Sequence, residues 1–372
     1  MKFTVNTKPL VEGLNLGILN SNISKYYQKS TIAQIKTKGD ELHINLEATS
    51  ILSEVVVKGS PDAGDGESEA IAFVDSLTLK QLVGTFETAT VVFEFSENGL
   101  ILHSGRSAYT LPYMIDEDAE IEFESPSKNA ASEWATIDKS SWKFVKDYQM
   151  FAIAMAFIHP VYTRVYVNGN GDVIVGDYDN SMFTHSKKST LGKACLLADT
   201  IVNLFNALPD GATIAENDSD GYIIHVHTDS FDFSAEFTPD YESNPDVGTY
   251  NSDIIINMMN SDVPGIKVNV GAINKILNQA ALLSSASEDK ITFSVSGDTL
   301  TLKDKNIDCA IASSTKSGLD YSIDFKTALF KPIISNSPDD EVEIRPLVDE
   351  DGEVTGILLI NKELKSVIAG VD

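Results

Sequence analysis

The chain has 372 residues, a hydrophobic content of 42% and a formal net charge of −27 at pH 7. This length and composition suit two or three folded domains, and the acidity argues against DNA binding by dense positive charge over the whole surface. No apolar run approaches the roughly 20 residues of a membrane span, the start MKFTVNTKPL lacks a signal-peptide core, and the two cysteines, Cys195 and Cys309, fit free thiols in a cytoplasmic protein.

A short alternating strand, a capping residue and a helix of about three turns recur six times along the chain. The first strands of these repeats begin at residues 3, 72, 135, 195, 267 and 321. Such a period indicates a repeated structural unit. Asp138, Asp199 and Asp324 stand where a carboxylate caps the free N–H groups of a helix start. We expect the helices at 8–20, 76–88, 138–156, 199–208, 271–284 and 324–337.

A β-hairpin follows each of these helices. The hairpins span 33–48, 91–104, 164–177, 213–228, 291–304 and 342–360, and nearly all contain turn residues such as Gly, Asn or Asp. One more strand, or the chain end, follows each hairpin, so each repeat is a β-α-β-β-β module. Breaks at 116–132 and 239–251 group the modules in pairs. The sequence therefore predicts an α+β fold with three domains, at 1–125, 126–250 and 251–372.

Lysines outnumber acidic residues within the six helices, although the rest of the chain is strongly acidic. In the third helix the lysines form one stripe, and an apolar stripe that includes Phe144 and Phe151 lies about 140° away. A solvated face would explain this pattern in a single helix. Its occurrence in several modules favours a shared surface with sparse positive charge, formed by Lys8, Lys80, Lys139, Lys143, Lys146, Lys275, Lys326 and Lys331.

The order of the modules, the lysine-bearing helices and several short stretches resemble the bacterial beta-type DNA sliding clamps. The stretches are MKFTV (1–5), SLTLKQLV (76–83), SGRSAYTLP (104–112), TRVYVNG (163–169) and FTPDY (237–241). The resemblance covers the whole chain and implies the DNA-clamp fold, with helices lining a ring and sheets outside. It implies a non-catalytic processivity factor, a head-to-tail homodimer that encircles double-stranded DNA without sequence preference. A clamp-loader ATPase would open the ring, and a DNA polymerase would be tethered to it.

In that family the strand at SGRSAYTLP pairs with the third domain of the next subunit. Ala108 replaces a second basic residue of the family, and KDKNID (303–308) replaces an acidic run. We therefore expect a more apolar and weaker interface, and the alternative is a monomer in which this strand is a plain domain edge. The resemblance assigns to the dimer interface Arg106, Ser107, Tyr109, Leu111, Leu282 and Leu283.

The family binds short hydrophobic peptides of its partners in a pocket between the second and third domains. Here YDNSM (178–182) stands at the family's Asp-Gly-His-Arg-Leu stretch, and LLINK (358–362) stands at its C-terminal end, followed by ELKSVIAGVD (363–372) as an extra tail. These departures predict a divergent clamp of phage origin with an altered peptide preference. Alternatively, the apolar members are ordinary core. By position, the pocket consists of Val167, Asp177, Asp179, Met182, Pro239, Leu358, Leu359 and Ile360.

We expect no catalytic residue, metal or cofactor. His225 and His227 lie two positions apart on a predicted strand, but no cysteine or third histidine is near them in the sequence. Ser104 and Ser107 have no histidine at a position to activate them. The alternative function is that of a β-rich structural or adhesion protein of a virus or cell surface, in which lysines on helix faces would have no purpose.

Overall fold

The computed structural model divides the chain into two compact units, Met1–Lys139 with Ala198–Pro239, and Ser140–Leu197 with Asp240–Asp372. It describes residues 1–18, 32–48, 51–62, 69–114, 123–126, 130–139, 142, 165–167, 172–177, 182–188, 191, 193, 195–197, 199–241, 259–283, 290–335, 337, 339–361 and 364–371. Its helices are α1 (Thr7–Gly17), α2 (Ser76–Val83), α4 (Asp199–Ala207), α7 (Val270–Leu283) and α8 (Thr327–Ser335). The division into three domains stays a prediction.

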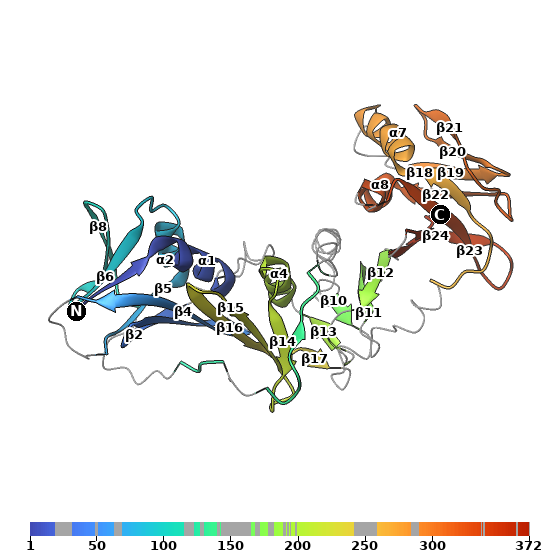
Figure 1. Ribbon diagram of the computed structural model, residues 1–372. Coiled ribbons are helices and arrows are strands. Elements are labelled where there is room, and N and C mark those ends of the chain that lie inside the picture. The colour runs from blue at the N-terminus through green and yellow to red at the C-terminus, as the bar shows by residue number, and fades with distance from the viewer. Residues whose placement is uncertain are drawn as a thin grey trace. The chain divides into compact units, whose positions relative to one another are not determined.

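The first unit contains one antiparallel sheet of twelve strands (Figure 1). The main path through it runs β8-β7-β6-β1-β4-β16-β15-β14-β9, with β2 joined to β3 and β5, and β3 joined to β4. Its strands are β1 (Lys2–Asn6), β2 (Ile32–Lys38), β3 (Glu41–Ala48), β4 (Ile51–Pro61), β5 (Ile71–Asp75), β6 (Thr90–Ser96), β7 (Gly99–Ser104), β8 (Ser107–Leu111), β9 (Ala135–Thr136), β14 (Thr213–Glu216), β15 (Tyr222–His227) and β16 (Phe231–Phe237).

The second unit contains a nine-stranded sheet and a four-stranded sheet. The larger sheet has the order β17 (Asp240–Tyr241), β13 (Cys195–Leu197), β10 (Val165–Val167), β11 (Asp172–Asp177), β12 (Met182–Lys188), β25 (Lys365–Ala369), β24 (Val354–Ile360), β23 (Glu341–Val348) and β18 (Ile266–Asn269). The smaller sheet has the order β21 (Asp308–Ala312), β20 (Thr299–Lys303), β19 (Lys290–Ser296) and β22 (Tyr321–Lys326).

The element order confirms the predicted module. The sequence β-α-β-β-β appears as β1-α1-β2-β3-β4, β5-α2-β6-β7-β8, β13-α4-β14-β15-β16, β18-α7-β19-β20-β21 and β22-α8-β23-β24-β25. The remaining module has β9, β10, β11 and β12 as its described strands. Most of its predicted helix, 138–156, including Lys143 and Lys146, lies outside the described residues. Helices and antiparallel strands occur together in the other five modules, which confirms the predicted α+β class.

Neighbouring modules exchange their first strands. β1 pairs with β6 of the next module, and β5 pairs with β2 of the previous one. The same exchange joins β9 to β14 and β13 to β10, and it joins β18 to β23 and β22 to β19. Each module thus supplies a strand to the sheet of its neighbour.

The last strands of the modules make a second kind of pairing. β4 pairs with β16 from Val57↔Phe231 to Ile51↔Phe237, and β12 pairs with β25 around Thr184↔Ser366. By contrast, β8 pairs only with β7, and β21 pairs only with β20, within the described strands. β8 and β21 are therefore sheet edges.

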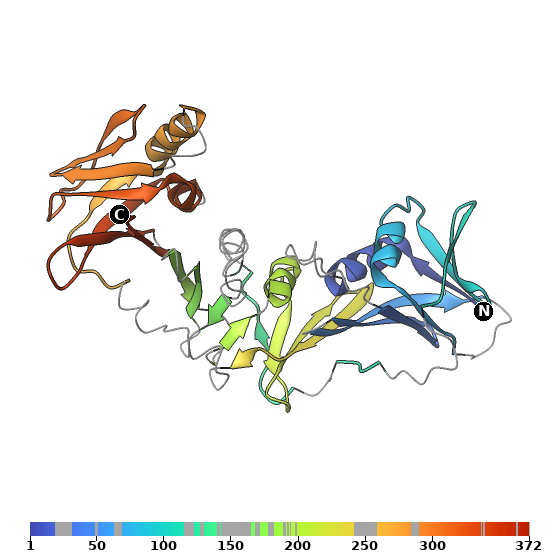
Figure 2. The same ribbon diagram turned by 180° about the vertical axis from the view of Figure 1, so that it is seen from behind.

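The helices of the first unit lie together on one face of its sheet, as Figure 1 and Figure 2 both show. α1 contacts α2, α4, β4 and β16. Leu10 and Leu14 of α1 are buried, as are Val55 and Val57 of β4. Gly13 permits this close packing, because a Cβ there would lie 2.3 Å from Cγ1 of Val55. Alternation along each strand then directs the intervening side chains to the opposite, outer face.

One predicted helix start was wrong. Asp324 lies inside β22, where its carboxylate accepts a hydrogen bond from the hydroxyl of Thr292 at 2.6 Å. α8 begins three residues later, at Thr327. The reason is tertiary: the pairing of β22 with β19 continues to Lys326↔Lys290, which keeps this stretch extended. By contrast, Asp75 caps the start of α2, since its carboxylate accepts a 2.7 Å hydrogen bond from the Thr78 N–H.

The predicted extra tail at 363–372 was also wrong. Within it, Lys365–Ala369 form β25, which pairs with β24 on one side and with β12 on the other. The Asn361 N–H donates to the Leu364 carbonyl at 2.8 Å, which extends the pairing of β24 and β25 beyond Ile360↔Lys365. The segment is therefore the last strand of the sixth module, in the same place as the last strand of every other module.

Candidate DNA-facing and partner interfaces

The exposed faces of α1 and α7 each present a lysine. Lys8 is exposed in the first turn of α1, with Nζ 3.9 Å from Oε1 of Glu12. An exposed pair of this spacing contributes only about 0.3–0.5 kcal/mol, so it leaves Lys8 available to other anions. Lys275 is exposed on α7, while Ile273 and Leu277 of the same helix are buried. Both lysines lie on helix surfaces away from the core.

Lys80 is engaged inside the first unit. Its ammonium donates a hydrogen bond to the carbonyl of Ile18, the residue after α1. Burial lowers the pKa of Lys80 below its ordinary value. The bond ties α2 to the end of α1 and satisfies a carbonyl in the region where a helix leaves its carbonyls unpaired. Lys80 is therefore less available to an external anion than Lys8.

The other predicted DNA-facing lysines differ in their settings. Lys139 is exposed near β9, and Lys331 is half-buried in α8. Lys326 is exposed, but it is the last residue of β22 and not part of a helix as predicted. Lys143 and Lys146 lie outside the described residues. The described lysines thus form a sparse set, of which Lys8, Lys139, Lys275 and Lys326 are exposed.

The edge strand β8 presents most of the side chains predicted for a dimer interface. Arg106 and Ser107 are exposed, and Tyr109 is 40% exposed. The Tyr109 ring stacks on Phe86, with centroids 5.5 Å apart. Leu111 is buried in the core of the first unit. The edge therefore combines one arginine with an aromatic pair.

A second edge, β21, lies beside the C-terminal end of α7. Leu282 and Leu283, the last residues of α7, are 84% and 59% exposed. Asn306, in the loop between β20 and β21, fixes this end by donating from Nδ2 to the Leu283 carbonyl at 3.1 Å. Lys303 lies 3.5 Å from Asp308, which offsets part of the positive charge expected in KDKNID. Two such exposed leucines form an apolar surface of the kind that proteins use for association.

The sheet register brings part of the predicted peptide pocket together. Asp177 and Met182 face each other across β11 and β12. Phe183, next to Met182, pairs with Val367, and Val367 pairs with Leu358. Met182 and Leu358 therefore lie in neighbouring rows of one sheet, two strands apart.

The other residues predicted for that pocket lie in several separate places. Leu358 and Leu359 are buried in β24, and Ile360 at its end is half-buried. Val167 is buried in β10, paired with Val173 and Cys195. Pro239 is buried in the first unit, and Asp179 lies outside the described residues. The pocket itself stays a prediction.

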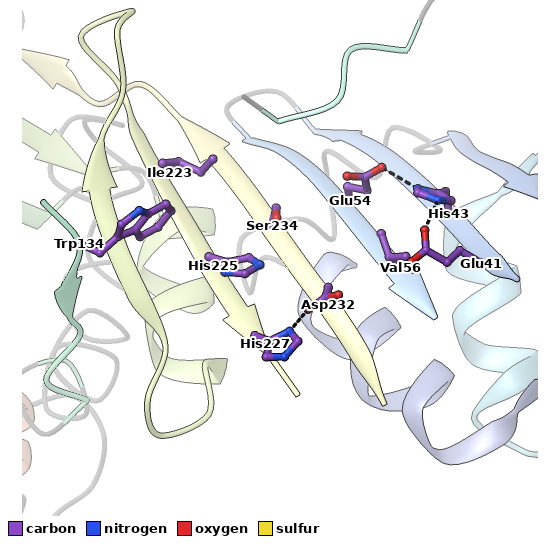
Figure 3. Close-up of a pocket in the computed structure, with 10 residues that line it drawn as sticks. All are labelled: Glu41, His43, Glu54, Val56, Trp134, Ile223, His225, His227, Asp232 and Ser234. Atoms are coloured by element: carbon purple, nitrogen blue, oxygen red, sulfur yellow. Dashed lines mark hydrogen bonds and ion pairs between the residues drawn. The ribbon is translucent and has the colours of Figure 1, made fainter. Parts of the chain in front are cut away.

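Sequence reasoning missed a cavity of about 330 Å³ on the outer face of the first unit's sheet (Figure 3). It is lined by three histidines and three acidic residues of β3, β4, β15 and β16, together with Trp134. The alternation of each strand placed these residues on one face, but it could not show that the four strands are adjacent. That adjacency depends on the pairing of β4 with β16.

Two negative findings apply to the described part of the chain. None of its helices combines the length and apolar character needed to cross a membrane. None of its groups of three or more His, Cys, Asp or Glu residues is arranged to hold a metal ion.

Paired β-α-β-β-β modules, with exchanged first strands and with helices on one sheet face, define the DNA sliding-clamp fold. Solved structures of bacterial beta clamps match the chain from end to end. The C. crescentus beta sliding clamp has a TM-score of 0.75 and 12% identity, with 100% of this chain and 99% of that chain covered. The Bacillus subtilis DNA polymerase sliding clamp has a TM-score of 0.72 and 15% identity at the same coverage. The Helicobacter pylori beta clamp, solved with a DNA ligase peptide, has a TM-score of 0.71 and 10% identity, with both chains fully covered.

No protein-family model matches the chain, and no curated protein matches it. At identities of 10 to 15%, the solved structures establish the fold alone.

Proposed function

We propose that this protein is a non-catalytic DNA sliding clamp, a ring that encircles double-stranded DNA and tethers a DNA polymerase. The observation that carries the proposal is which last strands have partners and which do not. Last-strand pairings join the first module to the fourth through β4 and β16, and the third to the sixth through β12 and β25. The second and fifth modules end in β8 and β21, the two last strands that have no second neighbour among the described strands. Pairing of β8 with β21 of a second copy would complete the series and close a head-to-tail ring.

The two edges are compatible in length and character. β8 and β21 are each five residues long. Tyr109 and Phe86 accompany one edge, and Leu282 and Leu283 accompany the other. Exposed strand edges with apolar neighbours are an aggregation hazard unless they are paired. A homodimer with two such interfaces would cover all of these side chains.

The distribution of charge suits a clamp that slides. In the ring, exposed lysines such as Lys8 and Lys275 would face the phosphates across water. Their small number gives weak, salt-screened attraction, whereas a dense basic lining would hold DNA in place. The net charge of −27 keeps the remaining surface from binding DNA. Retention would therefore depend on topology rather than on affinity.

The partners of the proposed clamp are a DNA polymerase and a clamp-loader ATPase. The Helicobacter pylori beta clamp was solved with a DNA ligase peptide, which supports peptide recognition by this fold. We assign the corresponding pocket here to the region of Met182 and Leu358, with the other predicted lining residues around it. The setting would be a bacterial cytoplasm or the cytoplasm of a phage-infected host, and the divergence of the pocket favours a phage origin.

The test is retention on nicked circular DNA in the presence of the loader, before and after the DNA is linearised. A clamp stays on the circle and is released when the circle is cut. Unchanged retention on linear DNA at the same salt concentration would overturn topological binding. Light scattering tests the ring separately: the dimer has twice the 40.4 kDa mass of one chain, and a monomer at micromolar concentration would overturn closure by two copies.

The DNA-facing surface has its own test. Lys8→Glu with Lys275→Glu should reduce retention on circular DNA and make the loss of retention with rising salt less steep. Both side chains are exposed, so the unfolding midpoint should stay unchanged. Lys38→Glu with Lys316→Glu, two exposed lysines outside the helices, is the matched control. Equal retention by the two double variants would contradict the assignment.

A further inference from the structure

A second cavity lies where β24 ends and β23 begins, in the larger sheet of the second unit. It has a volume of about 660 Å³, which is within the range of ligand pockets. Lys267, Glu343 and Ile360 form one cross-strand row along it. Ile360 was also predicted for the partner-peptide pocket, but Met182 and Leu358 are not among the described residues that line this cavity. The cavity is therefore separate from the region of Met182 and Leu358.

The lining of this cavity is negatively charged. Four of its eight residues are acidic and one is a lysine. Glu343 has a cationic partner, since Nε of Arg345 donates to its Oε1 at 2.7 Å. Two N–H groups in the first turn of α7 donate to the Asp340 carbonyl and to Oδ1 of Asn269, both at 2.9 Å, so neither uses a carboxylate of the cavity. The exposed carboxylates of Asp340 and Glu341 therefore remain available, and the cavity favours a cation.

Asn361 gives an observation that is independent of charge. The residue is only 8% exposed, and its Oδ1 is buried without a hydrogen-bond partner among the described residues. Buried polar atoms are nearly always paired in folded proteins, and an unpaired one costs free energy. Asn361 belongs to the lining of the cavity, so a donor group of a bound ligand can supply the missing hydrogen bond. The site therefore requires a ligand that is both a cation and a hydrogen-bond donor.

The strand register places Asn361 and Asp340 within reach of one ligand group. The last pair of β23 and β24 is Glu343↔Ile360. Extension of this register by one pair places Asn361 across from Val342, and alternation places Asp340 on the same face as Val342. Asn361 and Asp340 are then diagonal neighbours at about 7–8 Å, a separation that one ammonium between the two side chains can bridge.

The rest of the lining favours an ammonium on an aliphatic chain. Val342 and Ile360 provide apolar surface, against which a lysine packs its methylene groups while its charged end stays at polar atoms. The three donors of an ammonium point in different directions, which suits acceptors from separate strands. A guanidinium would lack a ring on which to stack, since none of the described lining residues is aromatic. The acidic groups of the described chain are not arranged to hold a metal ion, which leaves an organic cation.

We propose that this cavity binds a lysine side chain of a partner protein, with Oδ1 of Asn361 and the carboxylate of Asp340 as the acceptors. Its volume of about 660 Å³ leaves room for the residues on either side of the lysine. The acidic lining and the cationic side chain are complementary in charge. The proposal goes beyond the clamp function, since it requires neither DNA nor a ring.

The experiment uses the peptide acetyl-Ala-Ala-Lys-Ala-Ala-amide labelled with fluorescein, and its counterpart with Nε-acetyl-lysine, which keeps the aliphatic chain but removes the charge. Fluorescence anisotropy at low salt should show binding of the lysine peptide and at least about tenfold weaker binding of the acetylated peptide, as expected for loss of a charged hydrogen bond. Equal binding of the two peptides would overturn the proposal.

A pair of charge variants locates the binding on the protein. Asp340→Asn should weaken the binding of the lysine peptide about tenfold. Asp351→Asn removes the same charge from the exposed turn between β23 and β24 and should bind the peptide as the unmodified protein does. Equal weakening in the two variants would show general electrostatic attraction and overturn the site.

A third variant tests the uncharged acceptor. Asn361→Leu should also weaken the lysine peptide about tenfold, while the urea midpoint should not fall, because the substitution removes a buried polar atom that has no partner among the described residues. Unchanged peptide binding in Asn361→Leu would overturn the site, since the carboxylates alone would then account for the attraction. Asp340→Asn should keep the retention on circular DNA, so that failure of the peptide experiment and failure of the clamp function are distinguishable.

Discussion

The two leucines that end α7 give a quantitative prediction for ring closure. Leu282 and Leu283 are 84% and 59% exposed, and full burial of a leucine side chain contributes about 1.5–3 kcal/mol. Covering both would contribute about 2–4 kcal/mol to each interface. A head-to-tail dimer contains two interfaces, so Leu282→Ser with Leu283→Ser should raise the dimer Kd by at least about 10³-fold.

Sedimentation from nanomolar to micromolar protein concentrations measures this change. Because both leucines are exposed within the single chain, the urea midpoint should stay the same where both proteins are monomeric. Val348→Ser, which changes a partly exposed apolar residue at the end of β23, is the control and should dimerise as the unmodified protein does. A dimer Kd within tenfold of the unmodified value in the double variant would refute the reasoning.

Two other predictions concern the stability of the folded chain. Gly99→Ala should cost more stability than Gly297→Ala in urea unfolding. Both glycines have positive φ, at 138° and 57°, but an added Cβ at Gly99 would lie 2.5 Å from the Leu111 carbonyl, whereas at Gly297 it would meet nothing within 4 Å. We expect about 1 kcal/mol for the conformational cost at Gly297 and about 2–3 kcal/mol at Gly99, and equal losses would contradict the clash. The hydrogen bond from His103, 2.6 Å away, lowers the pKa of Glu94 below 4.5. Its contribution, below about 1 kcal/mol, is therefore complete above pH 4.5 and is lost as the pH falls through the lower folded value. His103→Leu should flatten the fall in unfolding free energy between pH 5 and 3, and parallel curves would contradict it.

Local turn chemistry explains why the hairpins could be predicted from the sequence. Gly39, Gly99, Gly297 and Gly352 all have positive φ at hairpin turns, and glycine adopts that conformation without strain. Each turn sets the register of its two strands, which in turn sets the faces of their side chains. The hairpin predicted at 33–48, for example, corresponds to β2 and β3.

Long-range pairing explains what could not be predicted. The start of α8 depends on how far β22 pairs with β19, and the role of residues 363–372 depends on β12, which is far away in the sequence. The cavity at Trp134 depends on the pairing of β4 with β16. None of these partnerships leaves a signal within a short window of sequence.

The two kinds of strand pairing decide how much of this chain can be removed without exposing a sheet edge. A module separated from its neighbour would keep its hairpin, but β5, for example, would lose β2, the strand with which it pairs in the preceding module. Backbone N–H and C=O groups along that strand would then lack their hydrogen bonds. Removal of a whole pair of modules would keep these exchanges but would separate last strands that pair across the unit, such as β4 and β16. The loss of one module or of two therefore exposes a strand edge in either case.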